Sequence, residues 1–217
     1  MLLHINLLDL LFASLVMWVI LITAEGAKRL GWVHGENARK LIHISVGIFL
    51  ATLPLYMNRR EIVAINFSLF AGLLLFSGLW HLFQSIEDVP RWTLGHFLYP
   101  LSIIIVTVIF RDQVVYAFAV LELALADGLA AVFGSWRGLK RYRSLGGYKT
   151  YFGSLVFFLI TLVLVGIFIS MRVGISPETI LIWLLISSFM TAVEGGFAGG
   201  FDNLFVPLVM AALLNAL

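Results

Sequence analysis

Long apolar runs alternate with short polar connections along the whole chain. Each run is long enough, as an α-helix, to cross or nearly cross a hydrocarbon layer of roughly 30 Å. The pattern predicts membrane helices near residues 5–24, 41–57, 62–80, 97–110, 114–133, 152–170, 179–193 and 204–216. The last run is short and begins within a glycine-rich stretch, so we expect seven or eight membrane segments.

Composition agrees with this pattern. Apolar residues make up 61% of the 217 residues and charged residues only 12%, which is too little charge to cover a soluble surface. We therefore predict an all-α fold, a polytopic transmembrane helical bundle that forms one integral membrane domain over residues 1–217. The first run opens with His4 and Asp9 and has no A-x-A-like cleavage site after it, so we expect it to be retained as a helix. The absence of cysteine excludes disulfides, thiolate metal sites and thiol nucleophiles.

The basic residues are distributed unevenly between the two ends of the predicted helices. With the N-terminus outside, the connections near 25–40, 81–96, 134–151 and 194–203 fall on one side. That side holds Lys28, Arg29, Arg39, Lys40, Arg91, Arg137, Lys140, Arg141, Arg143 and Lys149. The other side holds only Arg59, Arg60, Arg111 and Arg172. The positive-inside rule makes the first side cytoplasmic.

Two carboxylates lie inside the fifth apolar run, where a charge is costly and normally faces a protein interior or a wet cavity. On a regular α-helix, Asp127 shares a face with the small residues Ala124, Ala131 and Gly134. Such a stripe permits close helix approach or leaves room for a ligand. Glu122 falls about 140° away on the same wheel, so the two acids are not expected to pair. A packing role stays open for Asp127, and more so for Glu122.

The second run begins with R-K-x-x-H, formed by Arg39, Lys40 and His43. At helical spacings of three and four residues all three side chains can face one spot, and two cations beside an imidazole suit a phosphate. A basic anchor for anionic lipid headgroups is the alternative.

Residues 134–151 form the most polar piece of the chain, a predicted cytoplasmic loop with five basic residues and four glycines. Glycines let a backbone approach phosphate oxygens closely, and lysine or arginine neutralises their charge. The loop is not a Walker A motif. A basic loop is also what the predicted topology requires by itself.

A second polar stretch, residues 194–203, interrupts apolar sequence with four glycines, two carboxylates and an amide. Irregular backbone at this depth is tolerated where it lines a cavity or is buried in protein. Asp202 and Asn203 offer oxygen ligands of the kind that Mg²⁺ uses together with phosphates. A simple turn capped by Asn203 is the alternative.

Four motifs in this order resemble the polyprenol kinase group, which includes dolichol kinase, phytol kinase and CTP-dependent diacylglycerol kinase, and more distantly the phosphatidate cytidylyltransferases. They are R-K-x-x-H-x-x-x-G (Arg39, Lys40, His43, Gly47), D-x-x-A-x-x-x-G with a later glycine (Asp127, Ala130, Gly134, Gly138), a lysine before a small pair (Lys149, Thr150, Gly153, Ser154), and an acid before D-N-x-x-x-P (Glu194, Asp202, Asn203, Pro207). The resemblance spans residues 37–208. This chain departs from the group's usual pattern at Phe152, where a glutamate is typical, and at Gly128, where proline or serine is more usual.

The resemblance implies phosphoryl transfer from a nucleoside triphosphate, CTP more than ATP, to a lipid alcohol such as phytol, a polyprenol or diacylglycerol. It implies Asp127, Lys149 and His43 as catalytic residues, with His43 or a carboxylate acting on the lipid hydroxyl. Nucleotide binding falls to Arg39, Lys40, Gly134, Gly138, Lys149, Thr150, Gly153 and Ser154. Mg²⁺ would be held by Asp127 and Asp202, supported by Asn203 or Glu194.

The expected partners are thus a lipid alcohol, a nucleoside triphosphate and membrane lipids, with no nucleic acid. Two other functions stay open at this point. One is a nucleotidyl transferase that makes a CDP-lipid. The other is a transporter without chemistry, which would use its buried carboxylates for ion coupling.

Overall fold

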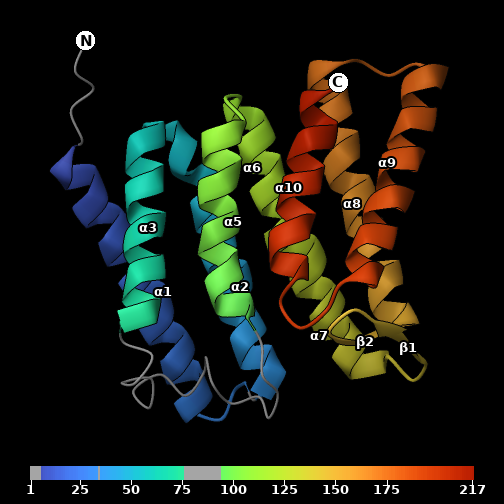
Figure 1. The fold of residues 1–217 in the computed structure, drawn as a ribbon. Helices are drawn as coiled ribbons and strands as arrows, with labels where there is room; N and C mark the ends of the chain where they lie inside the picture. The colour runs from blue at the N-terminus through green and yellow to red at the C-terminus, as the bar shows by residue number, and fades with distance from the viewer. Residues whose placement is uncertain (1–5, 34, 76–93) are drawn as a thin grey trace.

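The computed structural model describes residues 6–33, 35–75 and 94–217, and shows a bundle of helices that run back and forth along one direction (Figure 1). The elements are α1 (Leu7–Arg29), α2 (Gly35–Thr52), the 3₁₀ turn η1 (Leu53–Leu55), α3 (Arg59–Leu75), α5 (Gly95–Ile109), α6 (Gln113–Leu121), the π-helical segment η3 (Glu122–Asp127), α7 (Gly128–Arg137), β1 (Arg141–Ser144), β2 (Gly147–Thr150), α8 (Tyr151–Arg172), α9 (Pro177–Gly196) and α10 (Asp202–Asn215).

Within the described residues, 5 helices are long and apolar enough to cross a membrane: Leu7–Arg29, Asn37–Leu55, Gln113–Arg137, Tyr151–Arg172 and Pro177–Gly196. Gly95–Ile109 and Asp202–Asn215 are shorter apolar helices. The all-α fold is confirmed, with these 5 helices as candidate membrane spans. The number of seven or eight crossings stays a prediction, because the run near 62–80 continues beyond the described part of the chain.

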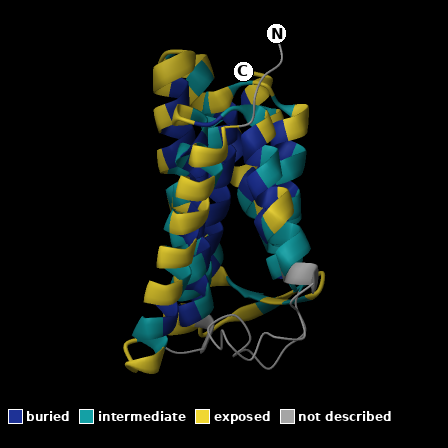
Figure 2. Ribbon diagram, turned by 90° about the vertical axis from the view of Figure 1, so that its left-hand side faces the viewer, coloured by how far each residue is buried: buried dark blue, intermediate teal, exposed yellow. Residues whose placement is uncertain are grey.

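The helix Gln113–Arg137 is the most buried of these spans, and α1 and α9 are the least buried. Figure 2 shows the same gradient, with buried residues along the middle of the bundle and exposed residues on its outside. The exposed side chains of α9 are mostly leucine, isoleucine and phenylalanine. An apolar outer face of this kind suits a lipid environment.

The central helix packs closely against α2 through small residues. A Cβ added to Gly47 would lie 2.5 Å from the Cβ of Ala124, so only glycine fits there. Ala124 is completely buried in this contact. The small-residue stripe beside Asp127 therefore serves close helix approach at Ala124.

The expectation of a regular α-helix around Asp127 is wrong. Residues Glu122–Asp127 form a π-helical segment, in which hydrogen bonds run from i to i+5 and the turn is wider. The angle of about 140° between Glu122 and Asp127 assumed α-helical geometry and does not apply. The two acids still do not pair, because Glu122 accepts a hydrogen bond of 2.5 Å from Thr161 in α8.

The predicted loop 134–151 also contains regular structure. Strands β1 and β2 form an antiparallel hairpin in which Tyr142 lies opposite Lys149 and Arg143 opposite Tyr148. The hairpin is joined to the segment after α9, since Leu145 N donates to Gly196 O over 3.0 Å and Ala198 N donates to Leu145 O over 2.7 Å. The polar segment is thus an anchored β-hairpin.

The turn after α1, the hairpin and the segment after α9 lie at the same end of the bundle (Figure 1). This matches the grouping expected from the basic residues, although Arg91 and the connection 81–93 lie outside the described residues. We call this the site end. The turns at η1, before α6 and after α8 lie at the opposite end.

Candidate functional site

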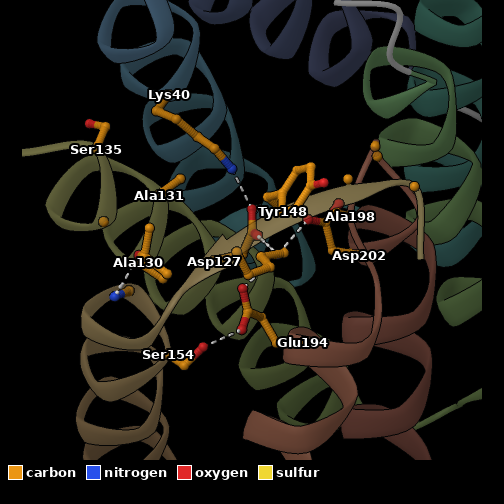
Figure 3. Close-up of a pocket in the computed structure, with 18 of the residues that line it drawn as sticks. Lys40, Asp127, Ala130, Ala131, Ser135, Tyr148, Ser154, Glu194, Ala198 and Asp202 are labelled. Carbon is orange, nitrogen blue, oxygen red and sulfur yellow. Dashed lines mark hydrogen bonds and ion pairs between the residues drawn. The ribbon is translucent and has the colours of Figure 1, made fainter. Parts of the chain in front are cut away.

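A cavity of about 710 Å³ lies at the site end between α2, α7, the hairpin, α8 and the segment after α9 (Figure 3). This volume is within the range of about 300–1,000 Å³ that is typical of small-ligand sites. Most of its polar wall comes from the residues singled out in the sequence: Arg39, Lys40, Asp127, Lys149, Glu194 and Asp202.

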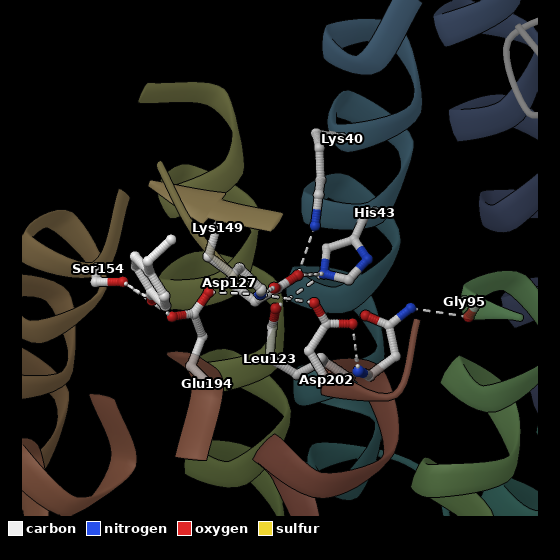
Figure 4. A network of polar contacts seen from close by, with 11 residues as sticks. Lys40, His43, Gly95, Leu123, Asp127, Lys149, Ser154, Glu194 and Asp202 are labelled. Atoms are coloured by element: carbon white, nitrogen blue, oxygen red, sulfur yellow. Dashed lines mark hydrogen bonds and ion pairs between the residues drawn. The ribbon is translucent and has the colours of Figure 1, made fainter. Parts of the chain in front are cut away.

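Lys149 is the centre of the polar network (Figure 4). Its Nζ donates to Glu194 Oε1 over 2.6 Å and to Asp202 Oδ2 over 2.8 Å, and lies 3.9 Å from Asp127 Oδ1. Burial alone lowers the pKa of Lys149, but the carboxylates of Asp202, Glu194 and Asp127 outweigh it and raise that pKa well above its usual range. The ammonium therefore stays charged at every physiological pH.

Asp127 joins this network to α2. Its Oδ2 accepts a hydrogen bond of 2.5 Å from Lys40 Nζ and lies 3.4 Å from His43 Nε2. All three side chains are buried. A buried carboxylate between two lysines is thereby fixed in direction.

His43 lies behind Asp127 and is not part of the cavity wall. Its Nε2 lies 2.9 Å from Leu123 O, and since a carbonyl can only accept, Nε2 carries the proton. Leu123 belongs to the π-helical segment, whose widened turn changes the usual pairing of backbone carbonyls. The imidazole thus contacts the backbone that carries Asp127, while its action on a substrate hydroxyl stays a prediction.

The segment after α9 brings Asp202 beside Lys149. Gly199 and Gly200 adopt positive φ angles of 68° and 99°, and a Cβ on Gly200 would lie 2.2 Å from Gly95 N. The chain can turn here only with glycine, and α10 then begins at Asp202. Asn203 is directed to a structural contact, because its Nδ2 donates to Gly95 O over 2.8 Å.

Tyr142 is a site residue that sequence reasoning missed. Its hydroxyl lies 2.6 Å from Ser154 Oγ, and Ser154 Oγ donates to Glu194 Oε2 over 3.5 Å. A Cβ on Gly195 would lie 2.7 Å from the Tyr142 hydroxyl, so any larger residue after Glu194 would displace that hydroxyl. Tyr142 stands directly opposite Lys149 in the hairpin. The sequence did not reveal the strand register, which places the side chains of Tyr142 and Lys149 on one face of the hairpin.

The predicted glycines divide into two groups. Gly134 and Gly153 line the cavity, but Gly138 does not. A Cβ on Gly138 would lie 2.1 Å from Gly134 O and 2.5 Å from Thr150 Cγ2, so Gly138 serves the packing of Thr150. Thr150 is the N-cap of α8 and accepts a hydrogen bond of 3.0 Å from Gly153 N.

A divalent cation fits this site only if phosphate oxygens of a bound nucleotide complete its coordination. Among the described residues, no three side chains of His, Asp or Glu are grouped so as to hold a metal ion by themselves. The oxygens of Asp127 and Asp202 nevertheless converge on one cation, the Lys149 ammonium. Carboxylate oxygens of this kind are Mg²⁺ ligands when phosphate oxygens complete the coordination.

Comparison with known proteins gives one informative match. The chain is 28% identical over 204 residues to a protein of Synechocystis sp. named phytol kinase, and the aligned part covers 93% of this chain and 88% of that protein. No family model matches the chain, and no solved structure matches it.

Proposed function

We propose, from this similarity, that the chain belongs to the polyprenol and phytol kinase family and phosphorylates an isoprenoid alcohol such as phytol or a polyprenol. The phosphoryl donor in this proposal is a nucleoside triphosphate, and we take CTP as the first candidate. The observation that carries the proposal is the cavity in which Lys149 meets Asp127, Glu194 and Asp202.

Lys149 is the residue proposed to bind the nucleotide phosphates. Its ammonium is held at the cavity wall by Glu194 and Asp202, so a triphosphate entering the cavity would meet a fixed cation. Arg39 and Arg141 also line the cavity and add positive charge at its wall. Positioned charges of this kind are the main requirement of phosphoryl transfer.

The acceptor would approach from the membrane side of the cavity. Ala130 and Ala131 of α7 line the wall next to Asp127 and leave room for an apolar chain. The alcohol oxygen forms a bond to the terminal phosphorus, and the bond from that phosphorus to the bridging oxygen breaks. The hydroxyl proton passes to a carboxylate, for which Asp127 is the nearest candidate, and the nucleoside diphosphate leaves with the bonding electron pair.

Mg²⁺ is part of the proposal as a partner of the nucleotide. Asp127 and Asp202 would hold it, and bound Mg²⁺ neutralises charge on phosphate oxygens. Lys40 then has a distinct task, because its 2.5 Å contact keeps Asp127 oriented while the metal and phosphate are absent.

The test is an assay of the purified protein with Mg²⁺, γ-labelled CTP or ATP, and separate lipid alcohols, including phytol, a polyprenol and diacylglycerol. We expect labelled lipid phosphate from an isoprenoid alcohol. Label transfer from α-labelled CTP would instead mark a nucleotidyl transferase, and no label from either donor would contradict both enzymes.

A pair of matched variants ties the activity to the cavity. Asp127→Asn should reduce turnover by about 10³-fold or more, because it removes charge from the proposed site. Asp112→Asn makes the same chemical change at the opposite end and should retain turnover. Equal activity of the two variants would place the reaction elsewhere.

A further inference from the structure

The end of α7 and the turn that follows it, residues 136–140, expose apolar and basic side chains together. Leu139 is 97% exposed and Trp136 69% exposed, and Arg137 and Lys140 are exposed beside them. The Arg137 guanidinium lies over the Trp136 ring, 4.8 Å from its centroid. A single exposed leucine needs no explanation, but this combination is typical of a membrane-interface segment.

The depth of the turn follows from the length of the helix that precedes it. The span Gln113–Arg137 has 25 residues and is therefore about 37 Å long, against roughly 30 Å of hydrocarbon. A helix longer than the hydrocarbon layer reaches the headgroup layer at one end or at both. Tryptophan is enriched at this level, because its ring is apolar and its N–H is polar. Figure 1 shows the end of α7 and the hairpin at the site end, on the border of the bundle.

The positive charge of this region is not balanced by acidic residues nearby in the sequence. No acidic residue occurs between Asp127 and Glu178. Arg143 on β1 is also exposed, and within the described part of the chain none of Arg137, Lys140 and Arg143 forms an ion pair with a carboxylate. Lys149 is already paired and Arg141 lines the cavity, so Arg137, Lys140 and Arg143 can contact another anion outside the site.

The turn is also held in place before any partner binds. Gly138 packs against Thr150, and Tyr151 N donates to Lys140 O over 3.2 Å. The exposed side chains therefore project from a fixed backbone, which lowers the entropy cost of binding.

We propose that residues 136–140, with Arg143, form a docking surface for anionic lipid headgroups of the leaflet at the site end. Trp136 and Leu139 enter the boundary between headgroups and acyl chains, while Arg137, Lys140 and Arg143 contact lipid phosphates. A leaflet fits better than a soluble acidic protein, because Trp136 and Leu139 are exposed at the end of a helix that is longer than the hydrocarbon layer. This proposal does not depend on the chemistry of the cavity.

The chain contains no cysteine, so Leu139→Cys gives a single site for an environment-sensitive fluorophore. The labelled protein is placed in nanodiscs of phosphatidylcholine with increasing phosphatidylglycerol. We expect a blue shift and loss of quenching by aqueous iodide as the anionic lipid increases. Lys140→Gln and Arg143→Gln should each weaken the response about fivefold, and high salt should weaken it further.

The matched control is Arg60→Gln with Arg111→Gln, which removes two exposed arginines from the opposite end and should leave the response unchanged. A label that stays accessible to iodide in every lipid mixture would overturn the proposal in favour of a soluble partner. The proposal would also be overturned if the label were equally buried in pure phosphatidylcholine and if the glutamine variants did not change this. The surface would then bind lipid through apolar contact alone. The same blue shift on adding pyrophosphate to neutral discs would replace the lipid with a soluble anion.

Discussion

The two ends of the bundle use their charged residues in opposite ways. At the opposite end, Arg172 pairs with Asp112, Arg59 donates to the carbonyls of Thr107 and Val108, and Glu61 accepts from the backbone of Asn6 and Asn58. Each of these charges completes the end of a helix or links two neighbours. At the site end, three carboxylates share one ammonium beside a cavity.

This difference separates structural charges from candidate catalytic charges. A capping or one-to-one pair satisfies backbone groups that would be orphaned in any helix bundle. The three acids around Lys149 accept from side chains, apart from the bond from Asn203 N to Asp202 Oδ1, and they oppose each other electrostatically. The fold therefore gains little from assembling them. Such an arrangement is expected where a ligand will redistribute the charge.

The largest expected effect is at Lys149. Lys149→Met should lower phosphoryl transfer by at least about 10³-fold and weaken nucleotide binding, because the fixed cation at the cavity wall is lost. The measurements are turnover and nucleotide affinity in one detergent. Arg172→Met is the matched control at the opposite end, where turnover should persist.

Since Lys149→Met leaves Glu194 and Asp202 without their partner, its folding must be checked separately. Lys149→Arg keeps the charge and should keep the thermal midpoint, yet the guanidinium cannot occupy the same point between the acids and turnover should still fall. Full activity of the arginine variant would contradict a positioned ammonium.

The next effect tests whether His43 acts on substrate or on the backbone of the π-helical segment. His43→Phe removes the donor to Leu123 O and should lower turnover about 10- to 100-fold, as is usual for supporting residues. His43→Gln retains an N–H donor of similar reach and should recover most of that loss. If the glutamine variant is inactive and the pH–rate profile loses one limb, His43 is instead the general base.

A smaller effect concerns the glycine that fixes the hairpin. Gly138→Ala brings a Cβ to 2.1 Å from Gly134 O, so the turn must shift and stability should fall by about 1–3 kcal/mol. Gly196→Ala meets nothing within 4 Å and should leave the thermal midpoint unchanged or raise it slightly. Unfolding followed by tryptophan fluorescence compares the two, and equal midpoints would show that Gly138 is not a packing requirement.

Sequence reasoning found the chemistry of the site better than its geometry. Asp127 and Asp202 stood out because charged residues are costly within apolar sequence, and Lys149 stood out through the motif that resembles the polyprenol kinases; the structure places the three together. The helices were visible for a related reason, since long apolar runs have few other solutions in a bilayer. The sequence could not predict features that depend on contacts between distant segments of the chain.

Three features show this limit. The π-helical segment depends on contacts with α2 and α8, and its residues are ordinary helix formers. The hairpin strands have 4 residues each, which is too short for a clear alternation pattern inside a basic loop. The role of Tyr142 follows only from its register opposite Lys149.

The smallest expected effect lies at the opposite end, where the Asp112–Arg172 pair should contribute to stability alone. Burial opposes ionisation of Asp112, but hydrogen bonds from Val114 N and Val115 N and the charge of Arg172 outweigh it and hold the pKa of Asp112 below its usual value. A carboxyl whose pKa is lower in the folded state stabilises the fold above its unfolded pKa of about 4, and this stabilisation is lost as the pH falls through the folded pKa.

Asp112→Asn isolates this charge, because asparagine is as good an N-cap as aspartate. The thermal midpoint of the parent protein should decrease more steeply than that of the variant as the pH is lowered below about 4. At neutral pH the two should differ by no more than about 1 kcal/mol, since the pair is partly exposed and screened by salt. A variant that loses phosphoryl transfer at neutral pH would show that the two ends of the bundle are not independent, and that the opposite end takes part in the function assigned here to the cavity.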